Sequence, residues 1–182
     1  MAIESSMLAL GTVAPPFALP EPATGRTLSN DDLTGPALVV TFICNHCPYV
    51  KHVADGLAAL GRDLAEQGFA MVGISSNDVN AYPQDGPDQM VAEARSHGWT
   101  FPYLYDETQD VARAYSAACT PDTFVFDRER RLVYRGQLDN SRPKNGRPVT
   151  AADVRAAVDA VLAGRPVDPE QRPSIGCGIK WR

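Results

Sequence analysis

Several features of common protein classes are missing from this chain of 182 residues. No apolar run approaches the ~20 residues that span a bilayer, and the first ten residues lack the basic and apolar regions of a signal peptide. Lysine and arginine total 17 against 22 acidic residues, a net charge of -5, so no basic surface for nucleic acid is expected. We therefore predict a cytoplasmic protein with neither a membrane nor a nucleic-acid partner.

Motifs for many cofactors and catalytic mechanisms are also missing. No glycine-rich phosphate loop, Ser–His–Asp order or paired carboxylate motif stands out, and we expect no cofactor. Histidine occurs three times and cysteine four times. In a reducing cytosol, four cysteines are more often redox-active or metal-binding than a structural disulfide framework. The cysteines are therefore the candidate functional residues.

The composition is that of an ordinary globular domain. Hydrophobic residues make up 44% of the chain and charged residues 21%, and the length suits one domain with a single core. We predict a single domain over residues 1–182, with its core in residues 11–164. The prolines and glycines after residue 164 predict an irregular C-terminal tail, residues 165–182.

One strand–helix–strand unit dominates the pattern. Ala37 to Ile43 is an almost continuous apolar run, typical of a strand that is buried on both faces. Pro48 suits the first turn of a helix, and apolar residues then recur at helical spacing to Gln67. A second apolar run, Phe69 to Ser75, follows. Such a unit predicts a right-handed crossover between two parallel strands.

The remaining segments complete the expected order of elements. The sequence predicts a hairpin of residues 17–19 and 26–28, a helix over 88–97, an edge strand over 101–105, a short helix over 108–118, a hairpin of residues 123–126 and 131–135, and a last helix capped by Thr150 and ended by Gly164. This order predicts an α/β fold with a mixed central β-sheet, helices on both faces and an N-terminal β-hairpin.

Three motifs add a resemblance to this pattern. They are Cys-Asn-His-Cys-Pro-Tyr-Val at residues 44–50, Thr-Pro-Asp-Thr-Phe at residues 120–124, and Gly-Cys-x-Ile-Lys-Trp at residues 176–181. With the element order, they resemble the thioredoxin superfamily. The N-terminal stretch from Gly11 resembles its redoxin or AhpC/TSA (peroxiredoxin-like) branch. The closer resemblance is to a group of thioredoxin-like proteins that carry all three motifs. It implies a thioredoxin-like fold.

The resemblance also implies which cysteine attacks. In the superfamily, an aromatic strand residue lies five positions before the nucleophilic cysteine, which stands at the helix N-terminus. Phe42 and Cys47 have that spacing. The second thioredoxin cysteine, and the peroxidatic cysteine of peroxiredoxins, would then fall at Val50. A thiol at a helix N-terminus faces unpaired N–H groups and the positive end of the helix dipole, which lower its pKa. Cys47 is thus the expected nucleophile.

The resolving thiol is left open among three cysteines. Cys44 is close in sequence but directed by the strand end. Cys119 precedes the predicted cis-proline loop, Thr120–Pro121, which the resemblance places against the nucleophile; a small buried hydrophobe is the alternative for Cys119. Cys177 lies in the tail, and an incidental exposed thiol is its alternative. His46 could stabilise a thiolate or act as a base, or could simply face solvent.

The sequence predicts a thiol–disulfide oxidoreductase. Cys47 would attack a disulfide-bearing protein or small molecule, a second cysteine would resolve the mixed disulfide, and a thiol electron donor would restore the dithiol. A peroxide reductase, with Cys47 oxidised to a sulfenic acid, is one alternative. A metal-binding or metallochaperone redoxin that uses Cys44, Cys47 and a histidine or third cysteine is another, because Cys-x-x-Cys is a common zinc spacing. A redoxin fold that only binds a partner is the third. The oligomeric state is not predicted.

Overall fold

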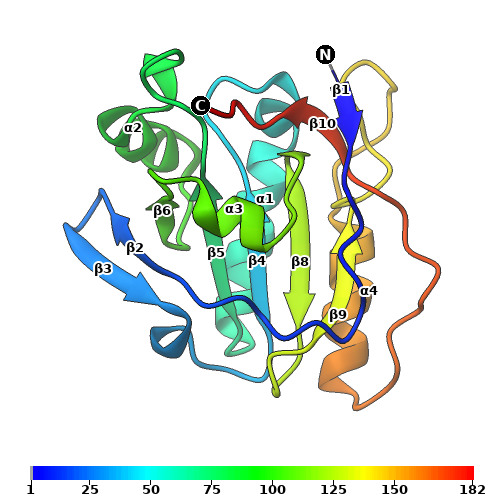
Figure 1. Cartoon of the computed structure of the whole chain (residues 1–182). Coiled ribbons are helices and arrows are strands. Elements are labelled where there is room, and N and C mark those ends of the chain that lie inside the picture. Colours follow the sequence, from blue (N-terminus) through cyan, green and yellow to red (C-terminus); the bar gives the residue numbers. More distant parts are fainter. Residues whose placement is uncertain (1) are drawn as a thin grey trace.

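A mixed five-stranded sheet forms the centre of the computed structural model, which describes residues 2–182 (Figure 1). Its central strand β4 (Leu38–Phe42) is parallel to β5 (Ala70–Ser75), which is parallel to β6 (Tyr103–Tyr105). On its other side, β4 is antiparallel to β8 (Asp122–Phe126), which forms a hairpin with β9 (Leu132–Gly136). The predicted mixed central sheet is confirmed.

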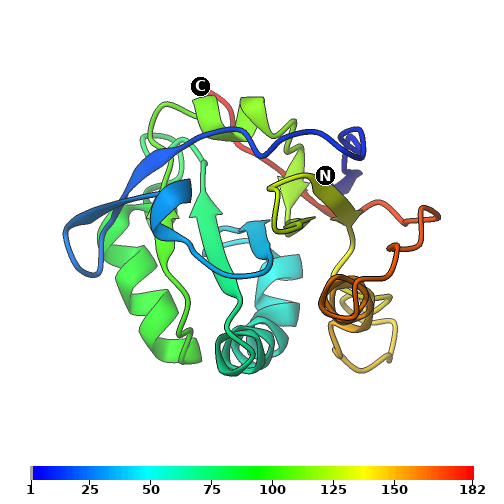
Figure 2. The same ribbon diagram turned by 90° about the horizontal axis from the view of Figure 1, so that it is seen from below.

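Helices cover both faces of this sheet, as Figure 2 shows. The long helices α1 (Pro48–Glu66), α2 (Pro87–His97) and α4 (Ala152–Leu162) contribute to one apolar cluster with the face of β4 that carries Val39. The short helix α3 (Asp110–Ala114) packs on the opposite face. The predicted helix over residues 108–118 is therefore much shorter than expected.

The central strand owes its position to complete burial. All five residues of β4 are buried, and alternate side chains enter the two apolar clusters. Phe42 packs edge-on against Tyr115 and Phe124, with ring centroids 5.5 and 5.9 Å apart. Aromatic pairs of this kind contribute about 0.5–1.5 kcal/mol beyond the area they bury. The end of β4, where the first cysteine follows, is thus held rigidly.

Short elements connect these layers. The predicted N-terminal hairpin is present as β2 (Ala18–Glu21) and β3 (Arg26–Ser29), paired antiparallel. Two 3-10 helices, η1 (Asn30–Asp32) and η2 (Pro83–Asp85), lie in loops. Within residues 2–182, no helix has both the length and the apolar character needed to cross a membrane.

The prediction of an irregular tail is wrong for its last part. Ile175–Gly178 forms strand β10, which pairs antiparallel with β1 (Ala2–Glu4) on one side and with β7 (Cys119–Thr120) on the other. Figure 1 shows β10 beside β1 at the upper edge of the molecule. The partner strands lie far away in sequence, so the local pattern of prolines and glycines gave no indication of this pairing.

The predicted cap of the last helix is also wrong. Helix α4 is preceded by Ala151 in the left-handed region (φ 55°), and no side chain of its own caps it. Instead, the buried carboxylate of Asp139 accepts the backbone N–H groups of Thr150 and Ala151 at 2.6 and 2.7 Å. Asp139, in the same connection between β9 and α4, thus holds the residues that lead into the helix.

Candidate functional site

The corner between β4 and α1 places Cys47 at the start of the helix. Cys47 is the N-cap residue of α1, with an extended backbone (φ -68°, ψ 121°), and Pro48 is the first helical residue. Proline is favoured there because its fixed φ suits the helix and its missing N–H would have no partner. The Cys47 side chain makes no capping hydrogen bond to the helix, but the backbone of Val50 in the first turn contributes to lowering the pKa of the thiol. The helix N-terminus therefore favours a thiolate at Cys47.

Two further thiols are neighbours of this sulfur around Thr120. They belong to Cys44, at the end of β4, and to Cys177, on β10. Thr120 lies beside the group: its carbonyl oxygen is 3.2 Å from the Cys47 sulfur, and its hydroxyl is 3.4 Å from the Cys44 sulfur. Cys47 and Cys44 are only 0% and 1% exposed, whereas Cys177 is partly exposed. The structure thus brings together three of the four cysteines.

The interactions within this group favour ionisation of one thiol over the other. Interaction with Cys44, followed by Thr120, Cys177 and Val50, lowers the pKa of the Cys47 thiol, although burial opposes this shift. The interaction with Cys47, together with burial, raises the pKa of the Cys44 thiol. Cys47 therefore ionises more readily than Cys44.

The remaining cysteine is set apart. Cys119 is completely buried, and its sulfur lies 3.8 Å from the carbonyl oxygen of Pro121. Burial is the main cause that raises the pKa of the Cys119 thiol, followed by the charges of Asp122, Cys47 and Cys177. Cys119 is close to the site in sequence terms, but its sulfur does not join the three-thiol group.

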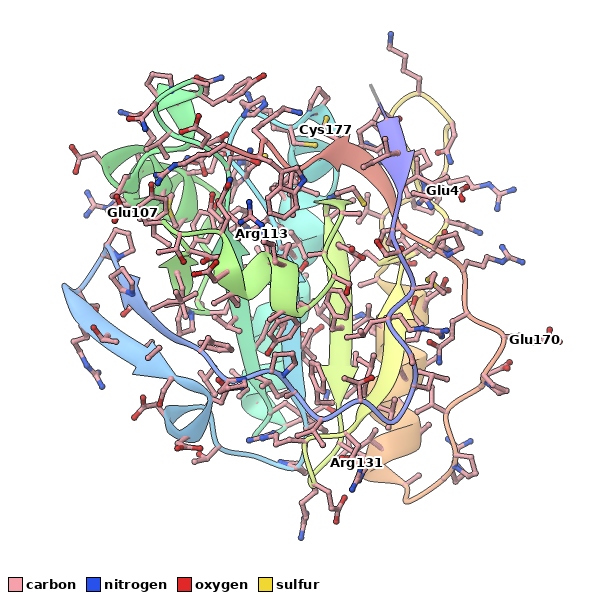
Figure 3. The ribbon with its side chains drawn as sticks, viewed as in Figure 1. Glu4, Glu107, Arg113, Arg131, Glu170 and Cys177 are labelled. Atoms are coloured by element: carbon pink, nitrogen blue, oxygen red, sulfur yellow. The ribbon has the colours of Figure 1, made fainter. Side chains whose placement is uncertain are left out.

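The Thr120–Pro121 loop connects the site to the tail. Its peptide bond is cis. Thr120 is paired with Cys177 across the β7–β10 ladder, and a Cβ at Gly176 would collide with the Thr120 carbonyl oxygen. The glycine therefore allows the tail to approach the loop closely. Figure 3 labels Cys177 on β10, where this approach occurs.

A buried carboxylate holds the loop before Cys47. The Nδ1 atom of His46 lies 2.6 Å from Oδ2 of Asp85, and the backbone N–H groups of Asn45 and His46 donate to Oδ1 at 2.9 and 3.1 Å. The His46 ring also stacks on Tyr82, with centroids 5.2 Å apart and planes inclined by 8°. His46 therefore has a fixed orientation and is not a freely solvated loop residue.

The same carboxylate is linked to the tail. The Asn77 side chain donates to Oδ2 of Asp85 at 2.8 Å and accepts the backbone N–H of Lys180 at 2.9 Å. Both side chains are buried. The sequence analysis missed Asp85, because a polar loop rich in turn residues has no pattern that distinguishes a buried carboxylate from a solvated one.

One grouping in the site has the residue types of a metal centre. Ligand atoms of Cys44, His46 and Asp85 lie within 4.8 Å of one another, and such atoms could hold an ion such as Zn²⁺. Both oxygens of Asp85 already accept N–H donors, two of them from the backbone. The hydrogen bonds therefore account for this carboxylate as the support of the loop before Cys47.

Comparisons with known proteins show the family and the fold of the chain. Residues 10–135 match the model of the AhpC/TSA family. The chain is 54% identical to an uncharacterized conserved protein from Geobacillus kaustophilus (TM-score 0.98; 100% of this chain and 97% of that chain covered). It is 51% identical to a hypothetical protein from Sinorhizobium meliloti 1021 (TM-score 0.96; 98% of each chain covered).

A more distant likeness bears on the fold. The thioredoxin domain of a thiol-disulfide oxidoreductase from Bacteroides vulgatus has a TM-score of 0.63 at 18% identity, covering 81% of this chain and 96% of that chain. At that identity the likeness concerns the fold alone, which is thioredoxin-like. No curated protein matches the chain.

Proposed function

Because this chain belongs to the AhpC/TSA family within the thioredoxin-like fold, we propose that it is a thiol–disulfide oxidoreductase with Cys47 as nucleophile and Cys177 as resolving thiol. The observation that carries this proposal is the three-thiol group. Cys47 stands at the N-cap of α1, and Cys44 and Cys177 lie beside it around Thr120. A low-pKa thiolate with a second thiol in reach has the parts needed for disulfide exchange.

The cycle begins at Cys47. Its thiolate attacks one sulfur of a substrate disulfide, and the other sulfur leaves as a thiolate. Cys177 then attacks the Cys47 sulfur of the mixed disulfide, which releases the second half of the substrate and leaves a Cys47–Cys177 disulfide. A thiol electron donor returns this disulfide to the dithiol. The family membership supports a thiol-dependent substrate and reductant of this kind.

The surroundings of Cys177 favour its ionisation after Cys47 has formed a mixed disulfide. Burial and the neighbouring Cys47 thiolate raise the pKa of the Cys177 thiol to about 11. Once Cys47 is bound in a mixed disulfide, its negative charge is gone and one cause of the raised pKa disappears. Cys177 therefore becomes a better nucleophile only after Cys47 has reacted.

The other site residues then have supporting roles. Cys44 and Thr120 lower the pKa of the Cys47 thiol and so favour its thiolate form. Pro121 shapes the loop that carries Thr120 beside the sulfur, and His46 fixes the corner through its contact with Asp85. Cys119 is a packing residue. We assign Cys177 and not Cys44 as the resolving thiol, because Cys44 is buried and strongly held in its protonated form.

A pair of serine variants tests the proposal. Cys47→Ser is expected to abolish reduction of a model protein disulfide such as that of insulin, and Cys119→Ser is the matched control that keeps the activity. A disulfide map of the oxidised wild-type protein is expected to show Cys47 joined to Cys177. Full reductase activity in Cys47→Ser contradicts the proposal.

Reduction of a peroxide is a second candidate function. The observation that favours it is the complete burial of Cys47, since a peroxide is smaller than a protein disulfide. The Cys47 thiolate would break the O–O bond, releasing water or an alcohol and leaving a sulfenic acid, and Cys177 would condense with it with loss of water. Peroxide consumption coupled to loss of two thiols, absent in Cys47→Ser, would place this activity first.

A further inference from the structure

The two sulfurs of a Cys47–Cys177 disulfide are unequally accessible. Cys47 is 0% exposed at the base of the corner, against the Thr120 carbonyl. Cys177 is partly exposed on β10, the middle strand of the small sheet near the surface. A thiolate attacks a disulfide sulfur from the side facing away from the sulfur that leaves. A donor thiol in solvent can therefore reach Cys177 more readily than Cys47.

We propose that the thiol electron donor enters the cycle at Cys177, so that the mixed disulfide of the reductive half forms on the tail. This inference rests on the proposed function. In the first step, the donor thiolate attacks the Cys177 sulfur. A bond forms between these two sulfurs, the Cys47–Cys177 bond breaks, and its electron pair leaves with Cys47 as a thiolate. A second donor thiol then attacks the donor sulfur, and Cys177 is released and protonated. Two donor thiols are oxidised to one disulfide, and the protein disulfide is reduced.

The pKa values of the two possible leaving thiols also favour attack of the donor on Cys177. Thiols of lower pKa leave faster in disulfide exchange. Attack on Cys177 expels Cys47, whose pKa is lowered by its hydrogen bonds, first of all that from Cys44. Attack on Cys47 would expel Cys177, whose pKa is raised by burial and by Cys47. Accessibility and leaving-group stability thus both direct the donor to Cys177.

A positive charge also stands beside Cys177. The Lys180 ammonium donates to the carbonyl oxygen of Gly178 at 2.7 Å, which holds it next to the cysteine, and its charge lowers the pKa of Cys177. A fixed cation attracts an approaching thiolate. The donor expected from this surface is an anionic small thiol, or a dithiol protein that presents its thiolate at an exposed position.

The experiment traps the mixed disulfide in the wild-type protein. The oxidised protein is first mapped by tandem mass spectrometry, and then mixed with reduced glutathione for a short time, quenched in acid, alkylated and mapped again. We expect the glutathione adduct on Cys177 and the alkyl group on Cys47, in at least about tenfold excess over the reverse pattern. The control is the same reaction in denaturant, where burial is abolished and both sulfurs should carry the adduct to similar extents.

Each other result is decisive. An adduct mainly on Cys47, or the same distribution in folded and denatured protein, overturns entry at Cys177 while leaving the proposed function intact. Absence of a Cys47–Cys177 disulfide from the first map overturns both, because the inference requires that disulfide as its starting point.

Discussion

The interaction of Cys44 with Cys47 lowers the pKa of the Cys47 thiol, and this effect can be measured. It is the largest cause of the lowered pKa of Cys47. A hydrogen bond to a charged group contributes about 1.5–3 kcal/mol, and one pKa unit corresponds to about 1.4 kcal/mol. Replacing Cys44 by alanine should therefore raise the pKa of Cys47 by about 1–2 units. Cys44→Ser keeps a donor at this position and should raise it less.

The assay is a pH titration of the thiolate. Ultraviolet absorbance of the thiolate is followed in the wild type and the Cys44 variants, with Cys47→Ser subtracted so that only Cys47 contributes. Cys119→Ala is the matched control, since its sulfur lies outside the three-thiol group. The reasoning is refuted if Cys44→Ala leaves the pKa of Cys47 unchanged, or if Cys119→Ala raises it equally.

Three other changes test the structure around the site. Asp85→Asn removes one carboxylate oxygen that accepts two side-chain N–H groups; we expect denaturant unfolding to show a loss of about 2–4 kcal/mol, with exposed Asp159→Asn near zero. Gly176→Ala forces a Cβ against the loop carbonyl and should cost about 1–3 kcal/mol and slow disulfide formation to the tail, whereas Gly178→Ala meets only a flexible side chain and should cost less. Burial raises the pKa of Asp122 from 3.8 to about 7. The contribution of Asp122 to the free energy of unfolding is therefore full below its unfolded pKa and is lost as pH rises through about 7. Asp122→Asn should lack this loss when unfolding is measured across that pH range.

Much of the framework followed from local sequence patterns. The run from Ala37 to Ile43 predicted a strand buried on both faces, and the period of apolar residues after Pro48 predicted helix α1 to within one residue of its end. The two elements could be told apart because the side-chain periods of strands and helices differ, and because proline suits a helix start for a local reason. Predicting the strand and the helix therefore required no knowledge of distant contacts. Cys47 was placed at the helix N-terminus by the same local reasoning.

The tertiary structure decided which groups meet Cys47. Asp85 lies 39 residues from His46, and Asn77 lies 103 residues from Lys180, yet these side chains connect the corner to the tail. Nothing in a polar loop shows whether its carboxylate will be buried, because burial depends on what the rest of the chain packs against it.

The cysteines show most clearly what the sequence predicted and what only the tertiary structure decided. The four cysteines predicted thiol chemistry, and the resemblance to the thioredoxin superfamily predicted Cys47 as its nucleophile. The sequence left the resolving thiol open among Cys44, Cys119 and Cys177, because spacing along the chain does not determine distance in space. Pairing of β10 with β7 brings Cys177 to the Cys47 sulfur, while the side chain of Cys119 lies against its own loop. Long-range strand pairing, which the local pattern does not show, therefore places Cys177, the resolving thiol of the proposed cycle, close to Cys47.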